Sequence, residues 1–456
     1  MIAPARLTAY EVLRAVSRGA SDLSGALAQV RARLADERDR ALAGEIATGT
    51  LRWQGAFDHI IATFTKRPVT KLDPEVLDIL RLTAFQLVHL DRIPASASVN
   101  DAVALTGKVG KRSASGLVNA ILRRISRERD HLPLPPRPNQ PAESPAVTSA
   151  LAYLETTLSH PRWLVERWLD RYGFDAVERW AIFDNSPAAL TLRTNTLRVS
   201  RQALADRLHA AGITTVATSF APNGLVVKEG NPLSTALATE GLFFVQDEAS
   251  QLVAEVVGAM AGERILDACA SPGGKTTAMA AAMDNRGVIV ATDLRGRRVD
   301  LLARTIGNLG AACARVVRAD ASAVLPFRAA FDAVLLDAPC SGLGTLRRDP
   351  DIRWRRSPDE LDDLAGRQLE MLQRAAAVLR PGGRIIYATC SSEPEEDEEV
   401  VAAFLSSHPD FRLAPERVPS GLTAFMTPGG HFRTLPFRDQ LEAFFAAILV
   451  KTKDLR

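Results

Sequence analysis

The chain has 456 residues, of which 46% are hydrophobic and 24% charged, and its formal net charge at pH 7 is +3. This composition is ordinary for a soluble globular protein, and the length predicts two or three domains of about 100–200 residues each. No apolar run approaches the length of about 20 residues that a membrane span needs, and residues 1–6 lack the apolar core of a signal peptide.

Residues 1–130 are predicted to form an all-helical domain. Apolar side chains repeat at helical spacing from Val76 to Val88, and Asp73 followed by Pro74 is a helix start, with Asp as the cap and Pro in the first position. The proline-rich stretch from Leu132 to Pro141 predicts a linker over residues 131–148. Further helices are predicted near 6–18, 38–64, 98–107 and 114–128.

Residues 149–245 mix helical and strand-like stretches, which predicts a small α+β domain. Its helices are expected near 162–184 and 200–211, and two of its strands near 189–193 and 224–227. From 246 to 456, strand-like runs alternate with helices, which predicts an α/β fold with a doubly wound sheet. These runs are 264–267, 288–293, 314–318, 333–337, 384–389 and 444–450. The acidic run from Glu393 to Glu399 is predicted to begin a helix, where carboxylates favour the positive end of the dipole.

A glycine-rich turn, D-A-C-A-S-P-G-G-K-T over residues 267–276, lies between a short apolar run and a helix-like stretch. A strand, a glycine-rich turn and a helix in that order predict a site for a nucleotide-type ligand, although the turn is neither G-x-G-x-x-G nor a P-loop. Three strand-like runs end in or near a carboxylate, at Asp293, Asp320 and Asp337. Asp293 lies about 20 residues past the glycines, a spacing that suits a grip on ribose hydroxyls. One such Asp alone could be a helix cap, but three together favour a cofactor site.

The four cysteines show no CxxC spacing, so we expect neither a disulfide framework nor a metal site, and a reducing, cytoplasmic compartment. Cys269 and Cys313 are interpreted as packing residues. Cys340 and Cys390 each follow a predicted strand and are expected where the next helix begins, a position that lowers a thiol pKa and exposes the sulfur. Two such thiols beside a nucleoside-like cofactor indicate covalent chemistry.

A thiolate that adds to carbon 6 of a pyrimidine makes carbon 5 nucleophilic toward an electrophilic methyl group. The adduct then loses the hydrogen on carbon 5 to a base and expels the cysteine. Asp337 is best placed to stabilise the activated ring, and a second thiol can assist the release.

Two clusters of basic residues suit a phosphate backbone and exposed bases. One runs from Lys108 to Arg129, and the other runs from Arg347 to Arg356 with Trp354 inside it. A solvated, charged helix face remains an alternative interpretation of each cluster.

The chain resembles the RNA cytosine-5 methyltransferases of the Nop2/Sun group, most closely the bacterial RsmB or Sun type that acts on 16S ribosomal RNA. The turn at 267–276 resembles the first motif of that family, with Ser271 where Ala is usual. Pro339-Cys340 and Thr389-Cys390 resemble its paired cysteine motifs, and residues 192–195, Leu-Arg-Thr-Asn, resemble the signature that opens its small domain. Residues 442–445, Glu-Ala-Phe-Phe, depart from the usual Asp-Gly-Phe-Phe.

The resemblance implies a class I, Rossmann-like methyltransferase domain over 246–456 and a NusB-like RNA-binding domain over 1–130. It also implies a monomer that methylates ribosomal RNA with S-adenosylmethionine as the methyl donor and that has no membrane partner. It implies that Cys390 attacks and Cys340 promotes release, and that Asp337 and Lys275 also take part in catalysis. The implied cofactor-binding residues are Cys269, Ala270, Ser271, Pro272, Gly273, Gly274, Lys275, Asp293, Asp320 and Asp337.

Three alternatives remain open at the level of sequence. The same chemistry could act on transfer RNA or another RNA. The roles of the cysteines could be exchanged, as in cytosine-5 DNA methyltransferases, where the Pro-Cys cysteine attacks. The chain could also be a non-catalytic, NusB-like RNA-binding factor, although the presence of both cysteines, Lys275 and Asp337 argues against that interpretation.

Overall fold

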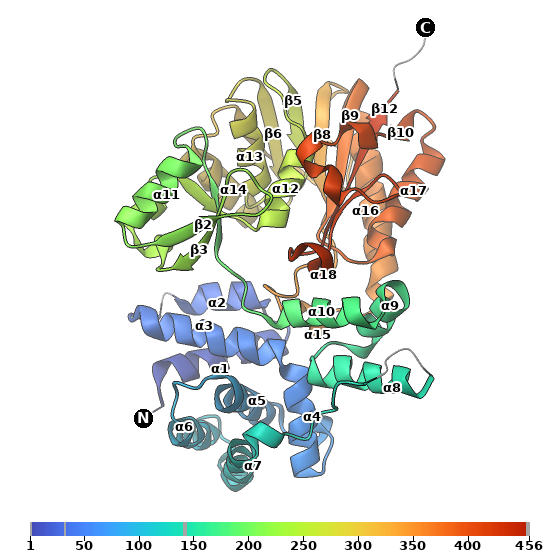
Figure 1. Cartoon of the computed structure of the whole chain (residues 1–456). Coiled ribbons are helices and arrows are strands. Elements are labelled where there is room, and N and C mark those ends of the chain that lie inside the picture. The colour runs from blue at the N-terminus through green and yellow to red at the C-terminus, as the bar shows by residue number, and fades with distance from the viewer. Residues whose placement is uncertain (1, 32, 140–143, 453–456) are drawn as a thin grey trace. The chain divides into compact units, whose positions relative to one another are not determined.

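The computed structural model describes residues 2–31, 33–139 and 144–452. The chain separates into two compact units (Figure 1). Unit 1 comprises Met1–Pro187 together with Leu346–Arg355, and unit 2 comprises Ala188–Thr345 together with Arg356–Arg456. Part of the predicted linker, residues 140–143, lies outside the described residues. No described helix is both long and apolar enough to cross a membrane.

Unit 1 is built from helices, as predicted for the N-terminal part of the chain. The side chain of Asp73 accepts a hydrogen bond from the backbone N–H of Glu75, which confirms the predicted cap. The helix expected over 38–64 is interrupted at Trp53, and the helix expected over 162–184 is broken at Gly173, whose φ is +73°. The helices are α1 (Pro4–Ser17), α2 (Leu23–Arg31), α3 (Glu37–Arg52), α4 (Gln54–Thr65), α5 (Pro74–His89), α6 (Ala95–Lys108), α7 (Ser115–Arg127), α8 (Ser144–Ala152), α9 (Arg162–Tyr172), α10 (Phe174–Asn185) and α15 (Ile352–Arg355).

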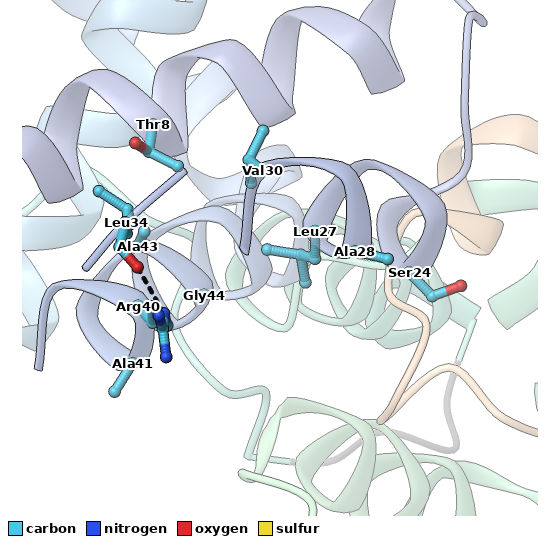
Figure 2. Close-up of a pocket in the computed structure, with 10 residues that line it drawn as sticks. All are labelled: Thr8, Ser24, Leu27, Ala28, Val30, Leu34, Arg40, Ala41, Ala43 and Gly44. Atoms are coloured by element: carbon cyan, nitrogen blue, oxygen red, sulfur yellow. Dashed lines mark hydrogen bonds between the residues drawn. The ribbon is translucent and has the colours of Figure 1, made fainter. Parts of the chain in front are cut away.

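Apolar side chains from α1, α3, α4, α5 and α7 form the main core of unit 1, with Val12, Ile46 and Ile79 fully buried. A second contact joins α9 to α10, where the rings of Trp168 and Trp180 stack with centroids 4.2 Å apart. A pocket of about 590 Å³ lies beside the main core, and Figure 2 shows its lining residues, which come from α1, α2, α3 and the loop before α3.

The second basic cluster does not form the exposed surface that the sequence suggested, because part of it is buried inside unit 1. Arg353 is 1% exposed, and its guanidinium donates to the backbone oxygens of Arg52 and Ser159 and to Oδ1 of Asn185. Trp354 Nε1 donates to the backbone oxygen of Leu51 at 2.6 Å. Burial lowers the pKa of Arg353 to about 10. Leu346–Arg355 is therefore an integral part of the helical unit.

Unit 2 begins with the small α+β domain, an antiparallel sheet of four strands in the order β2-β3-β1-β4. Leu192, Leu204, Leu208 and Leu225 form its core between the sheet and α11. Its elements are β1 (Thr191–Thr194), α11 (Arg201–Ala210), β2 (Thr214–Ala217), β3 (Gly224–Glu229) and β4 (Phe243–Val245).

The large sheet of unit 2 has the order β10-β12-β9-β8-β5-β6-β7, with β11 paired to β12. Strands β7, β6, β5, β8 and β9 are parallel, whereas β12 runs antiparallel to β9 and β10. The strands are β5 (Arg264–Asp267), β6 (Val288–Asp293), β7 (Ala314–Arg318), β8 (Phe331–Asp337), β9 (Leu379–Thr389), β10 (Phe411–Leu413), β11 (Phe432–Thr434) and β12 (Phe444–Lys451). The helices are α12 (Glu248–Val256), α13 (Gly274–Ala282), α14 (Gly296–Leu309), α16 (Asp359–Val378), α17 (Glu398–Ser407) and α18 (Pro436–Asp439).

The predicted doubly wound α/β sheet is thus confirmed. Strand β5 lies at the point where the order reverses, with β6 and β7 on one side and β8 and β9 on the other. Ligands of such sheets bind outside the carboxyl ends of the strands at this switch point.

Candidate active site

The glycine-rich turn connects β5 to α13 at the switch point. Gly273 has φ +105°, in the left-handed region that favours glycine, and a Cβ there would lie 3.0 Å from a side-chain carbon of Leu302. A Cβ on Gly274 would lie 2.9 Å from a ring carbon of Phe244. The turn therefore needs glycine at both positions, and it leads into the N-terminus of α13, where backbone N–H groups are available to a ligand.

Asp267, the last residue of β5, is a buried carboxyl that sequence reasoning did not select as a site residue. It is 1% exposed, and Thr276 Oγ1 donates to its Oδ2 at 2.6 Å. Burial raises the pKa of Asp267 to about 7. Its place as the first residue of the quoted motif was the only signal in the sequence.

Two of the predicted strand-end carboxylates lie along the same edge of the sheet. Asp293 is the last residue of β6 and is largely buried. Its Oδ2 lies 3.2 Å from Nε of Arg298. Asp320 follows β7, and its Oδ1 accepts hydrogen bonds from the hydroxyl and backbone N–H of Ser322, which lower the pKa of Asp320. Strands β8, β5, β6 and β7 are neighbours and parallel, so these carboxylates share the carboxyl edge with the turn.

The ends of β8 and β9 bring the two candidate cysteines together. Cys340 Sγ and Cys390 Sγ are 3.3 Å apart. Lys275, at the start of α13, forms an ion pair with Asp337, with Nζ 2.7 Å from Oδ2, and its ammonium lies over the ring of Phe444. The structure thus gathers the four predicted catalytic residues at one edge of the sheet.

The predicted environment of the cysteines is wrong in one respect, because neither cysteine begins a helix. The chain after Cys340 forms no helix before α15 at Ile352, and Cys390 is followed by a single 3-10 turn at Pro394–Glu396. The thiol pKa of Cys340 is raised well above its usual value rather than lowered, first by its hydrogen bond with Cys390 and then by burial. Cys340 is therefore a protonated thiol at neutral pH.

Lys275 keeps its charge although only 12% of its side chain is exposed. Burial disfavours the ammonium, but the ion pair with Asp337 outweighs that cost and raises the pKa of Lys275. Cys269 lies in the turn, where burial raises its thiol pKa, and Cys313 is a buried residue of the core.

The acidic run, which the sequence placed at the start of a helix, contains three buried carboxylates, at Glu393, Glu396 and Asp397. Helix α17 begins at Glu398, but Glu396 and Asp397 before it are fully buried. Asp397 accepts hydrogen bonds from Thr389 Oγ1 at 2.5 Å and from Arg433 at 2.9 Å, while burial raises its pKa well above the usual value. Asp397 thus fixes the end of β9, one residue before Cys390.

The arrangement suits a nucleoside cofactor better than a metal ion. Close backbone approach at the turn and a strand-end carboxylate at Asp293 are the features that hold an adenosine-type ligand. Among the residues that the structure describes, no group of three or more His, Cys, Asp or Glu side chains could hold a metal ion.

Comparison with protein families matches three consecutive parts of the chain. Residues 255–450 match the 16S rRNA methyltransferase RsmB/F model, residues 3–127 match the NusB family, and residues 160–234 match the ferredoxin-like domain of RsmF/B-like methyltransferases. The predicted helical, small α+β and Rossmann-like methyltransferase parts are therefore confirmed.

Related proteins cover almost the whole chain. It is 34% identical to ribosomal RNA small subunit methyltransferase B of Pseudomonas putida, over 98% of both chains. It is 33% identical to the probable ribosomal RNA small subunit methyltransferase B of Bacillus subtilis, over 91% of both chains.

Solved structures share the same architecture. The crystal structure of PH0851 has a TM-score of 0.81 and 27% identity, and covers 99% of both chains. A methyltransferase homolog protein from Pyrococcus horikoshii has a TM-score of 0.56 and 28% identity, over 68% of this chain and 100% of its own. The sequence, the fold and the relatives agree, and the chain belongs to the 16S rRNA methyltransferase RsmB/F family.

Proposed function

We propose that this protein transfers a methyl group from S-adenosylmethionine to carbon 5 of a cytosine in 16S ribosomal RNA, through a covalent adduct between Cys390 and carbon 6. The observation that carries the proposal is the pair of thiols 3.3 Å apart, beside the Lys275–Asp337 ion pair and the glycine-rich turn. Membership of the RsmB/F family supports the ribosomal substrate.

S-adenosylmethionine would supply the electrophilic methyl group. The backbone of the turn from Cys269 to Lys275 would hold it, with the carboxylates of Asp293, Asp320 and Asp337 as further contacts. Asp293 is the candidate for the ribose hydroxyls, because it ends the strand next to β5 and is largely buried.

Cys390 is our candidate for the nucleophile, as the resemblance to the RNA enzymes of the Nop2/Sun group implies. The pKa of the Cys340 thiol is raised well above its usual value, and its sulfur lies 3.3 Å from the sulfur of Cys390, so a protonated Cys340 is in contact with the sulfur that would attack. Attack of the thiolate on carbon 6 forms a C–S bond and moves the electron pair of the 5,6 double bond toward carbon 5, which then takes the methyl group.

Release reverses the first step. A base removes the proton from carbon 5, the 5,6 double bond re-forms, and the C–S bond breaks to return the Cys390 thiolate. Cys340 is the candidate to promote this step, because its sulfur is in contact with the sulfur that leaves. Asp337, fixed by Lys275, is the candidate to stabilise the activated ring.

The roles of the two cysteines are tested on a denaturing gel with unmodified 16S ribosomal RNA and S-adenosylmethionine. We expect Cys390→Ala to be inactive and to form no covalent complex, because it cannot attack carbon 6. Cys340→Ala should attack and methylate, and then remain trapped as a protein–RNA adduct that survives denaturation. Cys313→Ala is the matched control, because this cysteine lies in the apolar core.

Other outcomes would contradict the assignment. An adduct trapped in Cys390→Ala and absent in Cys340→Ala would mean that Cys340 attacks. Two active variants without any adduct would mean that both cysteines only pack. Methylation of transfer RNA but not of 16S ribosomal RNA would keep the chemistry and exclude the proposed substrate.

The first basic cluster offers a surface for the RNA. Several of its cations are already paired within unit 1: Lys111 with Asp73, and Arg129 with Asp91 at 2.7 Å. Three exposed side chains form no ion pair or hydrogen bond within the described ranges, and these are Lys108, Arg112 and Arg127. We propose that these three contact phosphates.

A further inference from the structure

We propose that Glu396 is a positioning residue, whose buried carboxylate clamps together the two loops that carry Cys340 and Cys390. The inference rests on the proposed function for its consequence in catalysis, but the clamp itself is a feature of unit 2. Glu396 is fully buried and forms no ion pair in the described part of the chain. Its role in this fold must therefore come from the hydrogen bonds that it accepts.

The carboxylate of Glu396 accepts hydrogen bonds from the residue that follows each cysteine. Ser341 donates from its backbone N–H to Oε1 at 2.8 Å and from its hydroxyl to Oε2 at 2.5 Å. Ser391 donates from its hydroxyl to the same Oε2 at 2.6 Å. One oxygen atom thus bridges the loops after Cys340 and Cys390.

A second layer of side chains holds the clamp. Gln368, on α16, donates from Nε2 to Glu396 Oε1 at 2.9 Å and to the backbone oxygen of Pro339 at 3.0 Å. Tyr387, on β9, donates from its hydroxyl toward the backbone oxygen of Glu396 and lies 3.0 Å from Gln368 Oε1. The loop before Cys340 is therefore tied to the same carboxylate as the loop after it.

An acceptor-only group fits this position because all four of its partners are donors. Ser341, Ser391 and Gln368 are at most 1% exposed, so bulk water does not reach these donors in the folded protein. If the carboxylate is lost, four buried donors lose an acceptor at once, and the loops lose the link that sets the spacing of the sulfurs. A further tie, from the backbone N–H of Gly344 to the backbone oxygen of Cys390 at 2.9 Å, should keep the loops folded in that case.

The test compares Glu396→Ala, which removes the clamp, with Glu396→Gln, which keeps its size, retains one oxygen and can donate to the two hydroxyls. Glu399→Gln is the matched control, because Glu399 is exposed and its side chain forms no hydrogen bond or ion pair with the residues that the structure describes. The first readout is hydrogen–deuterium exchange of peptides that contain Ser341, with peptides from α14 as the reference for the fold. The second is the rate of methyl transfer to 16S ribosomal RNA, separated into kcat and the KM for S-adenosylmethionine.

We expect Glu396→Ala to speed exchange at Ser341 by about 10-fold or more, because the N–H loses a buried acceptor. Its kcat should fall by about 100-fold, the usual scale for a reacting group displaced by about 1 Å, with the KM for S-adenosylmethionine unchanged. Glu396→Gln should stay within about 10-fold of the wild-type kcat, because most of its hydrogen bonds persist.

A folded Glu396→Ala variant with normal exchange at Ser341 and normal kcat would overturn the proposal. A Gln variant as slow as the Ala variant would also overturn it, since the carboxylate would then act by its charge. If Glu396→Ala does not fold, the variant Ser391→Ala tests the proposal instead, because it removes only one donor to the carboxylate. We expect it to lower kcat by about 10-fold. An unchanged kcat in Ser391→Ala would refute the clamp. The exchange readout needs no RNA, so the clamp can stand even if the wild type fails to methylate 16S ribosomal RNA.

Discussion

Replacement of the buried Asp267 by Asn should increase the stability of unit 2 relative to the wild type as the pH rises from about 5 to about 8. The carboxyl of Asp267 has an ordinary pKa of 3.8, and burial raises its pKa in the folded protein to about 7. Between these values the folded state keeps a proton that the unfolded state releases, so the free energy of unfolding falls as the pH rises through this window. The total loss is about 4 kcal/mol, at 1.36 kcal/mol for each pKa unit.

The amide of the Asp267→Asn variant cannot titrate, so the variant loses this pH dependence while Thr276 can still donate to the amide oxygen. Any intrinsic cost of the amide is independent of pH. The stability of the variant relative to wild type should therefore increase by about 3 kcal/mol between about pH 5 and about pH 8. Titrating groups that do not interact with Asp267 are common to both proteins and cancel in the comparison.

The assay must follow unit 2, because all five tryptophans lie in unit 1 and fluorescence would report that unit. Hydrogen exchange of peptides from β5 and β6 in increasing urea, corrected for the intrinsic effect of pH, gives the free energy of opening. Asp332→Asn is the control. Burial alone would raise the pKa of Asp332, but hydrogen bonds from Arg264 and Arg380 outweigh it and lower the pKa, so this group is ionised in both states across the window. A stability difference for Asp267→Asn that is as flat with pH as that of the control would refute the reasoning.

Two further predictions concern unit 1. Gly44→Ala should stabilise it by about 1 kcal/mol through helix propensity, because a Cβ on Gly44 meets no atom within 4 Å and faces the pocket of Figure 2. Gly49→Ala in the same helix should destabilise unit 1 by about 1–3 kcal/mol, because the new Cβ would overlap the ring of Phe85. Urea unfolding followed by tryptophan fluorescence measures the stability of both variants. Equal effects of the two substitutions would contradict the packing argument. Alanine at Lys108, Arg112 and Arg127 together should reduce the salt slope of RNA binding by about three units, as measured by titration of RNA binding against salt. The control Arg129→Ala, which removes a paired cation, should leave the slope unchanged. An unchanged slope in the triple variant would show that the cluster is a solvated face.

Local signals in the sequence were sufficient to predict the edge of the sheet that carries the candidate residues. Short apolar runs followed by Gly, Asp or Cys marked the carboxyl ends of β5, β6, β8 and β9, and parallel strands bring such ends together. The approach of Cys340 to Cys390 and of Lys275 to Asp337 follows from that rule, since each residue lies at or just beyond a strand end or at the start of α13.

Features that depend on packing could not be predicted in this way. The acidic run and the second basic cluster both have the composition of a solvated surface, yet Glu396, Asp397 and Arg353 are buried. Their burial is decided by partners far away in the sequence, such as Ser341 for Glu396 and Arg52 for Arg353. Periodicity also failed at Trp53 and Gly173, where one predicted helix became two, because a break of one residue hardly changes the apolar pattern of a long window.

The chain crosses from one unit to the other shortly after Cys340. After Cys340 the chain leaves unit 2 at Thr345, is held within unit 1 from Leu346 to Arg355, and returns to unit 2 at Arg356. The buried guanidinium of Arg353 needs acceptors from unit 1, and without them it would have to move into water. By contrast, the hydrogen bond from Thr276 to Asp267 and the ion pair of Arg298 with Asp293 both lie within unit 2. The segment Leu346–Arg355 is therefore part of the fold of unit 1, although its neighbours in the sequence on both sides belong to unit 2.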